Sequence, residues 1–280
     1  MSEKSTTIDQ SRGAGMLPRS QGVTVHMMWA EFTKVRTRIG LVAGTAILTV
    51  GAAVLVFGIN ASLHAGNPVK YGPAGGVQHL AAALGWVAVL SSFAAILVGA
   101  TAGASDVQSG VFRDLVSTGR SRVALFTARV PGGLALIWPF TAGAWAVACA
   151  ASVIFAGDLP SPTIADMIAG GTWVLLTTTC MYLLAVGLAS ATGSRTATVI
   201  PILLWQFFLS SVLVGMLGLG VLRQGLQMVA LTRLIPGGLH SGPSDPLISN
   251  MSVGVAAAVL VAWAVVPLAL GAWRTVARDA

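Results

Sequence analysis

Six long apolar stretches without a charged residue limit what this chain can fold into. Each reaches the roughly 20 residues that a helix needs to cross the hydrocarbon core of a bilayer. Because lipid cannot hydrogen-bond an exposed backbone, each stretch is expected to be helical. The sequence therefore predicts an all-α integral membrane protein with six transmembrane helices. They are expected near 40–59, 80–104, 131–156, 169–191, 197–220 and 251–273.

The composition supports a single membrane domain. Charged residues make up 9% of the chain and apolar residues 55%, whereas soluble domains contain about 25% charged residues. No polar segment is long enough to form a separate domain, so residues 24–280 are expected to form one transmembrane domain. Residues 1–23 are rich in polar residues and lack an apolar core. They are expected to be a disordered tail rather than a cleaved signal peptide.

The distribution of basic residues predicts the orientation, because Lys and Arg favour the cytoplasmic side of a membrane. Six helices put both termini on one side, and the segments on that side contain 13 of the 16 Lys and Arg residues. Only Lys70, Arg223 and Arg233 fall on the other side. Both termini, including the 1–23 tail, are therefore expected in the cytoplasm. The net charge of +7 then reflects topology and attraction to anionic membrane lipids, and it does not imply nucleic-acid binding.

Residues 24–38 are expected to form an amphipathic helix on the inner membrane surface. One face is apolar, and Trp29 together with Lys34, Arg36 and Arg38 suits the headgroup layer. The alternative is an ordinary basic segment before the first membrane helix. The apolar face contains Val25, Met28, Phe32, Val35 and Ile39, and the other face contains Glu31, Lys34, Thr37 and Arg38.

The loop after the second predicted helix, 105–122, could bind a cytoplasmic partner. Val111, Phe112 and Leu115 can cluster on one side of a short helix, with Asp106, Arg113 and Asp114 exposed. Apolar anchors ringed by polar contacts are typical of helix docking. The alternative is a loop whose arginines only set the topology.

This loop resembles the one after the second helix in type-2 permeases of ATP-binding-cassette (ABC) exporters. On that pattern Asp106 is the acidic residue, Gly110 the glycine, Arg113 the basic residue, Leu115 the apolar residue and Arg122 the later arginine. Asp106 is shorter than the usual Glu, and Gly119 stands where Pro is common. Arg129 occupies a position often held by Lys. The segment containing Trp29, Glu31, Phe32, Lys34, Arg36 and Arg38 similarly resembles the connecting helix of these permeases.

The resemblance implies a bacterial plasma-membrane exporter in which the loop contacts a cytoplasmic ABC ATPase dimer. Two permease chains, identical or different, would form the substrate route, and the cargo would be hydrophobic or amphiphilic. None of Lys4, Lys34 or Lys70 follows a glycine, so the chain lacks a phosphate-binding Gly-Lys-Ser/Thr loop. We therefore expect no catalytic or cofactor site in this chain, with ATP and Mg²⁺ on the partner ATPase.

The segment 221–250 between the fifth and sixth predicted helices is expected to lie outside the cell. Its first part, 221–234, is apolar but interrupted by Arg223, Gln227 and Arg233, and Pro and Gly residues follow. This pattern favours a short helix that dips into the outer leaflet, followed by turns. A long amphipathic loop is the alternative.

Three other functional classes are the alternatives. A secondary transporter usually needs an ionisable residue within the membrane, and the predicted helices contain none. A membrane enzyme would need a catalytic group, but residues 119–123 lack the last glycine of a G-x-S-x-G motif. Asp158 and Asp166 fit solvated loop charges better than a catalytic pair, and Cys149 and Cys180 indicate neither zinc nor a disulfide. A helical scaffold that only recruits a partner is also possible.

Two pairs of glycines have the small-x-x-x-small spacing that lets membrane helices approach closely. They are Gly40 with Gly44, and Gly99 with Gly103. Both pairs are expected at helix contacts.

Overall fold

The computed structural model describes residues 25–111, 121–239 and 250–277, and this part of the chain is helical without a strand. It contains six helices long and apolar enough to cross a membrane, which confirms the predicted all-α membrane fold. The predictions for residues 1–23, Arg113 and Leu115 fall outside the described residues.

Two of the six spans contain a π-helical turn. The first span, Ile39–Gly66, consists of α2 (Ile39–Ala46), η1 (Ile47–Gly51) and α3 (Ala52–Gly66). The fifth, Arg195–Gly215, consists of α8 (Arg195–Leu204), η2 (Trp205–Leu209) and α9 (Ser210–Gly215). The other four spans are α4 (Gly76–Gln108), α6 (Arg122–Ile154), α7 (Ile164–Thr192) and α12 (Val253–Ala277). The remaining elements are α1 (Val25–Arg36), η3 (Leu217–Gly225), α10 (Gln227–Arg233) and η4 (Gly237–Leu239).

Most helices extend beyond the predicted uncharged stretches. The third span begins at Arg122 instead of 131, and α4 continues past 104 to Gln108. Helix hydrogen bonding does not stop at the edge of the hydrocarbon, so charged residues prolong both helices. The Ser121 hydroxyl starts α6 by accepting a hydrogen bond from the Ala124 amide at 3.1 Å. The fifth span instead ends early, at Gly215 rather than 220, where the chain turns into η3.

The short turn expected between the fourth and fifth helices is present. Gly193 follows α7 with φ = 71°, a left-handed conformation that favours glycine. The Ser194 side chain then accepts a hydrogen bond from the Ala197 amide and caps α8. The two helices are therefore adjacent and antiparallel.

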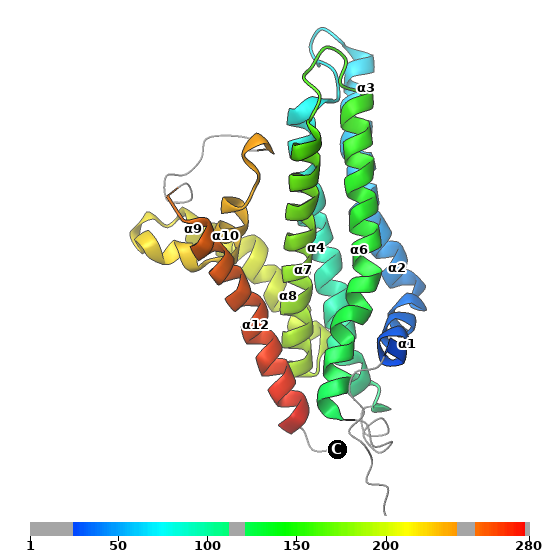
Figure 1. Ribbon diagram of the computed structural model, residues 1–280, viewed down its shortest axis with the longest axis vertical. Coiled ribbons are helices and arrows are strands. Elements are labelled where there is room, and N and C mark those ends of the chain that lie inside the picture. Colours follow the sequence, from blue (N-terminus) through cyan, green and yellow to red (C-terminus); the bar gives the residue numbers. More distant parts are fainter. Residues whose placement is uncertain (1–24, 112–120, 240–249, 278–280) are drawn as a thin grey trace, which may run out of the picture.

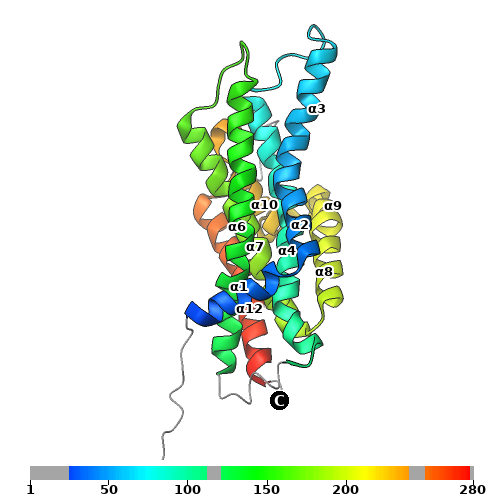
Figure 2. The ribbon, with the colours of Figure 1, turned by 90° about the vertical axis from the view of Figure 1, so that its right-hand side faces the viewer.

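The centre of the bundle is formed by α4, α6 and α7, with the first span on one side and α8, α9 and α12 on the other (Figure 1). The helix α1 crosses the lower part of the bundle beside α6 (Figure 2). The connection from α6 to α7 lies at the opposite end. The lower end therefore collects α1, the end of α4 and the start of α6.

The helices α4 and α7 approach closely at the second glycine pair. A Cβ added to Gly99 would lie 2.8 Å from the Tyr182 carbonyl oxygen, and one added to Gly103 would lie 2.7 Å from that of Val186. Gly40 and Gly44, in contrast, have no atom within 4 Å of an added Cβ. The predicted packing role is thus correct for Gly99 and Gly103 and wrong for Gly40 and Gly44 within the chain, because spacing does not reveal which helix face meets a neighbour.

Candidate functional site

The helix α1 packs on the bundle through a side that combines Val35 of the predicted apolar face with Glu31 and Lys34 of the predicted polar face. Met27 and Val35 are buried, and Glu31 and Lys34 lie between them, partly covered. Val25 and Ile39, also on the predicted apolar face, are 77% and 82% exposed. The side of α1 that contacts the bundle was therefore not predicted from the sequence. The cause is tertiary, because the bundle presents charged partners to Glu31 and Lys34.

Asp106 is one of these partners. It was predicted to be exposed, but it lies in the last turns of α4 and only 6% of it is accessible. Its Oδ1 accepts a hydrogen bond from Lys34 Nζ at 2.9 Å, and its Oδ2 accepts one from Arg129 Nη2 at 2.9 Å. A carboxylate near a helix C-terminus is unfavourable on its own. The two cations compensate that cost, and burial places both of them close to the carboxylate.

Arg129, near the start of α6, connects three helices. It is 1% exposed, and besides Asp106 its Nη1 donates to the Gly103 carbonyl at 3.1 Å and to Ser190 Oγ at 3.2 Å. These partners lie on α4 and α7. A planar guanidinium can bind several acceptors at fixed angles, which a lysine cannot. Arg129 therefore holds the lower ends of α4, α6 and α7 in one arrangement.

A fully buried tyrosine strengthens the same junction. Tyr182 on α7 donates its hydroxyl hydrogen bond to the Arg129 carbonyl oxygen at 2.6 Å. The ring lies against Gly133, where a Cβ would collide with it. The neighbouring Gly132 lets α1 approach, since a Cβ there would lie 2.6 Å from the Glu31 Cβ. Two successive glycines of α6 thus admit α7 on one side and α1 on the other.

Glu31 completes the group, with Lys34 Nζ at 2.6 Å from its Oε2. Burial raises the pKa of Glu31 above its ordinary value, and the Lys34 charge partly opposes this shift. We call Glu31, Lys34, Asp106 and Arg129 the ionic cluster. With all four groups ionised its net charge is zero, as a buried charged site requires. It connects the surface helix α1 to the ends of three membrane helices.

The other predicted site residues are dispersed around this cluster. Trp29 is exposed and lies 5.2 Å from the Phe32 ring, and the Arg36 guanidinium lies 6.0 Å from that ring. Gly110 has φ = 74°, just after α4. Arg122 does not approach Asp106; its Nη1 donates to the Val276 carbonyl of α12 at 2.8 Å. The start of α6 is therefore also linked to the last helix.

Sequence reasoning missed Ser190 and Tyr182 and did not predict that Arg129 is buried. One signal was present, because Arg129 lies two residues before the uncharged stretch at 131–156. A basic residue so close to the hydrocarbon is often paired. Nothing in the local pattern marks Ser190, which enters the site only through the packing of α7 on α4.

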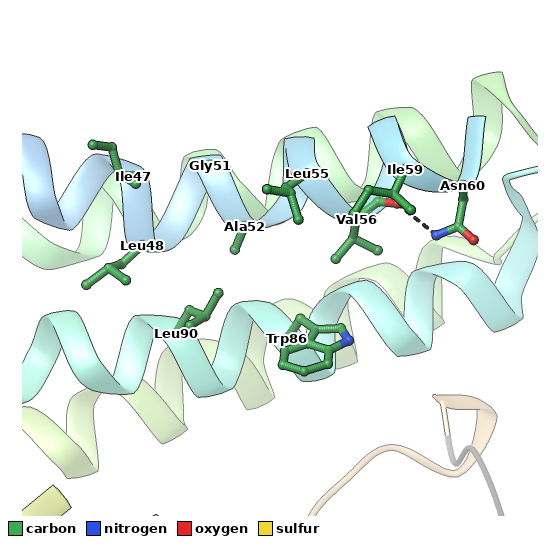
Figure 3. Close-up of a pocket in the computed structure, with 10 residues that line it drawn as sticks. All are labelled: Ile47, Leu48, Gly51, Ala52, Leu55, Val56, Ile59, Asn60, Trp86 and Leu90. Atoms are coloured by element: carbon green, nitrogen blue, oxygen red, sulfur yellow. Dashed lines mark hydrogen bonds between the residues drawn. The ribbon is translucent and has the colours of Figure 1, made fainter. Parts of the chain in front are cut away.

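An apolar groove of about 610 Å³ lies between the first span and α4, higher in the bundle (Figure 3). Leu48 from η1 and Ala52 from α3 point toward Trp86 and Leu90 from α4. The single amide in the wall belongs to Asn60, whose Nδ2 already donates to the Val56 carbonyl at 2.7 Å. The groove can accept a hydrocarbon surface and offers almost no hydrogen bonds.

A second, more polar pocket of about 290 Å³ lies between α4, α7, η2 and α10. Its wall includes Trp173 and Phe207 together with polar residues such as Ser92, Thr177 and Gln206. Each pocket adjoins one of the two π-helical turns, a distortion that often accompanies functional sites. The two pockets therefore differ in polarity but share this backbone feature.

The carboxylate pair considered for catalysis is explained structurally. Asp166 accepts hydrogen bonds from the Thr163 amide and hydroxyl in a capping box that starts α7. Within the described ranges no group of three or more His, Cys, Asp or Glu side chains could hold a metal ion. No family model matches this chain, and no curated protein matches it significantly.

Proposed function

We propose that this chain is the permease subunit of a type-2 ABC exporter in a bacterial plasma membrane. In this proposal both termini are cytoplasmic and α1 lies on the inner membrane surface. A cytoplasmic ABC ATPase dimer binds ATP and Mg²⁺, and a second permease chain, identical or related, completes the transporter. The observation that supports the proposal best is the ionic cluster, because it connects α1 to the end of α4 that leads into the 105–122 loop.

The cluster suits the transmission of force from such a loop. Removing one partner from a buried ion pair costs about 3–5 kcal/mol, so motion of the loop is expected to move Asp106, Lys34 and Arg129 together. The helices α1, α4 and α6 would then tilt as one body. A shift between inward-open and outward-open arrangements requires this kind of rigid-body motion.

The groove in Figure 3 supports the choice of cargo. Its wall is apolar, so the hydrocarbon part of a hydrophobic or amphiphilic molecule can lie against it, since that part has no hydrogen bonds to satisfy. A drug, antibiotic, lipid-like molecule or peptide would meet this requirement.

The segment after the fifth span is proposed to lie at the external surface. Met216, Val221 and Leu222 are exposed apolar residues at η3, and Arg223 Nη1 donates to the Val214 carbonyl at 2.7 Å. Such a segment can insert its apolar side chains into the outer leaflet while Arg223 stays hydrogen-bonded. The short helix α10 follows it.

A secondary transporter is the second candidate, and one observation favours it. The observed spans include Asp106 and Arg129, which the predicted charge-free helices did not. Buried ionisable residues can bind a coupling ion or relay protons. Their mutual pairing at one end of the bundle fits a structural link better than a path across the membrane.

The test is affinity purification of the tagged protein in mild detergent, with identification of what co-purifies. The proposal predicts an ABC ATPase with the native chain and its loss with Arg113→Glu and Arg122→Glu combined. Lys70→Glu is the matched control, because Lys70 lies in an exposed connection at the other end of the bundle. Transport into inverted vesicles should require ATP. A chain that purifies alone and transports with a proton gradient would overturn the proposal in favour of a secondary transporter.

A further inference from the structure

A pocket of about 320 Å³ at the lower end of the bundle contains two arginine side chains. Arg38 directly precedes the first span, and Arg195 is the first residue of the fifth. Both are odd-numbered spans, so both start at the same membrane surface. The two arginines therefore belong to the same end of the bundle and line one pocket there.

Neither arginine has an acidic partner in the described structure. The described residues include four carboxylates, of which Glu31 and Asp106 belong to the ionic cluster. The other two, Asp158 and Asp166, lie near the connection of α6 and α7 at the opposite end. Arg195 also places a positive charge in the first turn of α8, which the helix dipole disfavours. An anion from outside the chain would neutralise the two arginines and would also offset the unfavourable helix dipole at Arg195.

The rest of the pocket is apolar except for Thr45, whose hydroxyl already donates to the Leu41 carbonyl at 2.8 Å. Leu41 and Leu97 form its walls, and Gly40 and Gly44 leave space where other residues would place side chains. A free anion would use only the arginines, whereas a molecule with an anionic head and a hydrocarbon chain would use both parts. The pocket thus combines the two features of an amphiphile-binding site.

We propose that the Arg38–Arg195 pocket binds an anionic phospholipid. The phosphate lies between the two guanidinium groups, and one acyl chain lies along Leu41 and Leu97 over the two glycines. Arginine binds phosphate strongly because its fork of N–H donors matches the phosphate oxygens. This site does not depend on the proposed transport function, since it requires only that the chain lies in a membrane.

Native mass spectrometry of the purified, delipidated full chain in detergent tests the proposal. The probes are phosphatidylglycerol and phosphatidylcholine with the same acyl chains. The native chain should retain one phosphatidylglycerol more tightly than phosphatidylcholine. Arg38→Gln combined with Arg195→Gln should lower phosphatidylglycerol affinity roughly 30-fold, as expected for two arginines at an anionic lipid.

Matched variants separate this site from general surface attraction. Arg36→Gln combined with Arg274→Gln removes the same charge from exposed positions at the same end and should leave the binding within about twofold. Gly44→Leu should block the pocket with both arginines present, whereas Gly58→Leu, also in open space on the first span, should not. These single-residue changes keep the test valid even if the double variant unfolds.

Inorganic phosphate distinguishes a lipid site from a free-anion site. It should not displace phosphatidylglycerol at equal concentration, because it cannot use the apolar wall. Displacement would overturn the proposal. Equal binding of the two lipids, equal losses in the pocket and control double variants, or no effect of Gly44→Leu would also overturn it.

Discussion

Arg129 shows how much one residue can determine in a membrane bundle. Its guanidinium group contacts α4 and α7, and its carbonyl oxygen accepts the Tyr182 hydrogen bond. It is almost completely buried, so the loss of its charge would leave Asp106 with Lys34 as its remaining cation. Arg129 is thus the residue on which the lower junction most depends.

Arg129→Leu is therefore expected to destabilise the protein by about 3–5 kcal/mol, because it leaves the buried ionic cluster with one uncompensated negative charge and Asp106 Oδ2 without its donor. The midpoint of thermal unfolding in detergent measures the effect. Arg274→Leu is the control, since Arg274 is exposed on α12 and its loss should stay within about 0.5 kcal/mol. Adding Asp106→Leu to Arg129→Leu should recover part of the loss. Equal stability of both single variants would contradict the role of the cluster.

The raised pKa of Glu31 predicts a pH dependence. Its ordinary pKa is 4.5, and burial raises it in the folded chain, where Lys34, Asp106 and Arg129 face it. The neutral form is therefore favoured by folding, so this contribution to stability is complete below 4.5 and is lost as the pH rises through the folded pKa.

The unfolding midpoint of the native chain should thus fall relative to that of Glu31→Gln as the pH rises from 4.5 to 8. Glu31→Gln should be at least as stable as the native chain at neutral pH. Both chains contain the same other titratable groups, so the difference between their midpoints reports the titration of Glu31. If the midpoint of the native chain instead rose relative to that of the variant with increasing pH, the Lys34 charge would lower the Glu31 pKa more than burial raises it.

At the scale of elements, α1 illustrates why an amphipathic pattern does not determine how a helix packs. Val35 of its apolar face is buried, but the same side of the helix also turns Glu31 and Lys34 toward the bundle and leaves Val25 exposed. In a membrane protein, lipid covers exposed Val25 and Ile39 at no cost, while charges gain most from buried partners. The orientation was decided by Asp106 and Arg129 on other helices.

The α4–α7 contact predicts opposite effects for two equal substitutions. Gly99→Ala places a Cβ 2.8 Å from the Tyr182 carbonyl, so the helices must separate, at a cost of about 1–3 kcal/mol. Gly58→Ala meets open space and should stabilise its helix by up to about 1 kcal/mol. Thermal unfolding of both variants in the same detergent checks the pair. A gain in stability for Gly99→Ala would contradict the close approach.

At the scale of the whole molecule, the six candidate spans predict that the two termini share one side of the membrane. The excess of basic residues at the lower end of the bundle predicts that this side is the cytoplasm. The same end contains the ionic cluster and the Arg38–Arg195 pocket. The proposed coupling and lipid sites therefore share one leaflet.

Labelling of intact cells with a membrane-impermeant maleimide tests this orientation. Lys70→Cys lies in an exposed connection at the opposite end and should be labelled, whereas Arg274→Cys should react only after the cells are opened. The native Cys149 and Cys180 are buried, so the unsubstituted chain is the background control. Labelling of Arg274→Cys in intact cells would reverse the proposed topology.

The sequence by itself determined the number, order and helical nature of the six spans. This was possible because the need to satisfy the backbone in lipid acts within each segment and is visible as a run of uncharged residues. The turn at Gly193 could be predicted for the same reason, because it depends only on neighbouring residues. The helix ends were less predictable, since hydrogen bonding continues into polar residues such as Arg122 and Gln108.

Only the tertiary structure decided that Asp106 is buried, that α1 turns Glu31 and Lys34 toward the bundle, and that Gly99 and Gly103 touch a neighbour while Gly40 and Gly44 do not. Each of these depends on residues far away in the chain, such as Lys34 with Asp106 and Arg129 with Ser190. A periodic pattern states which residues share a helix face. Which face is buried follows from the charges and shapes that the other helices present to it.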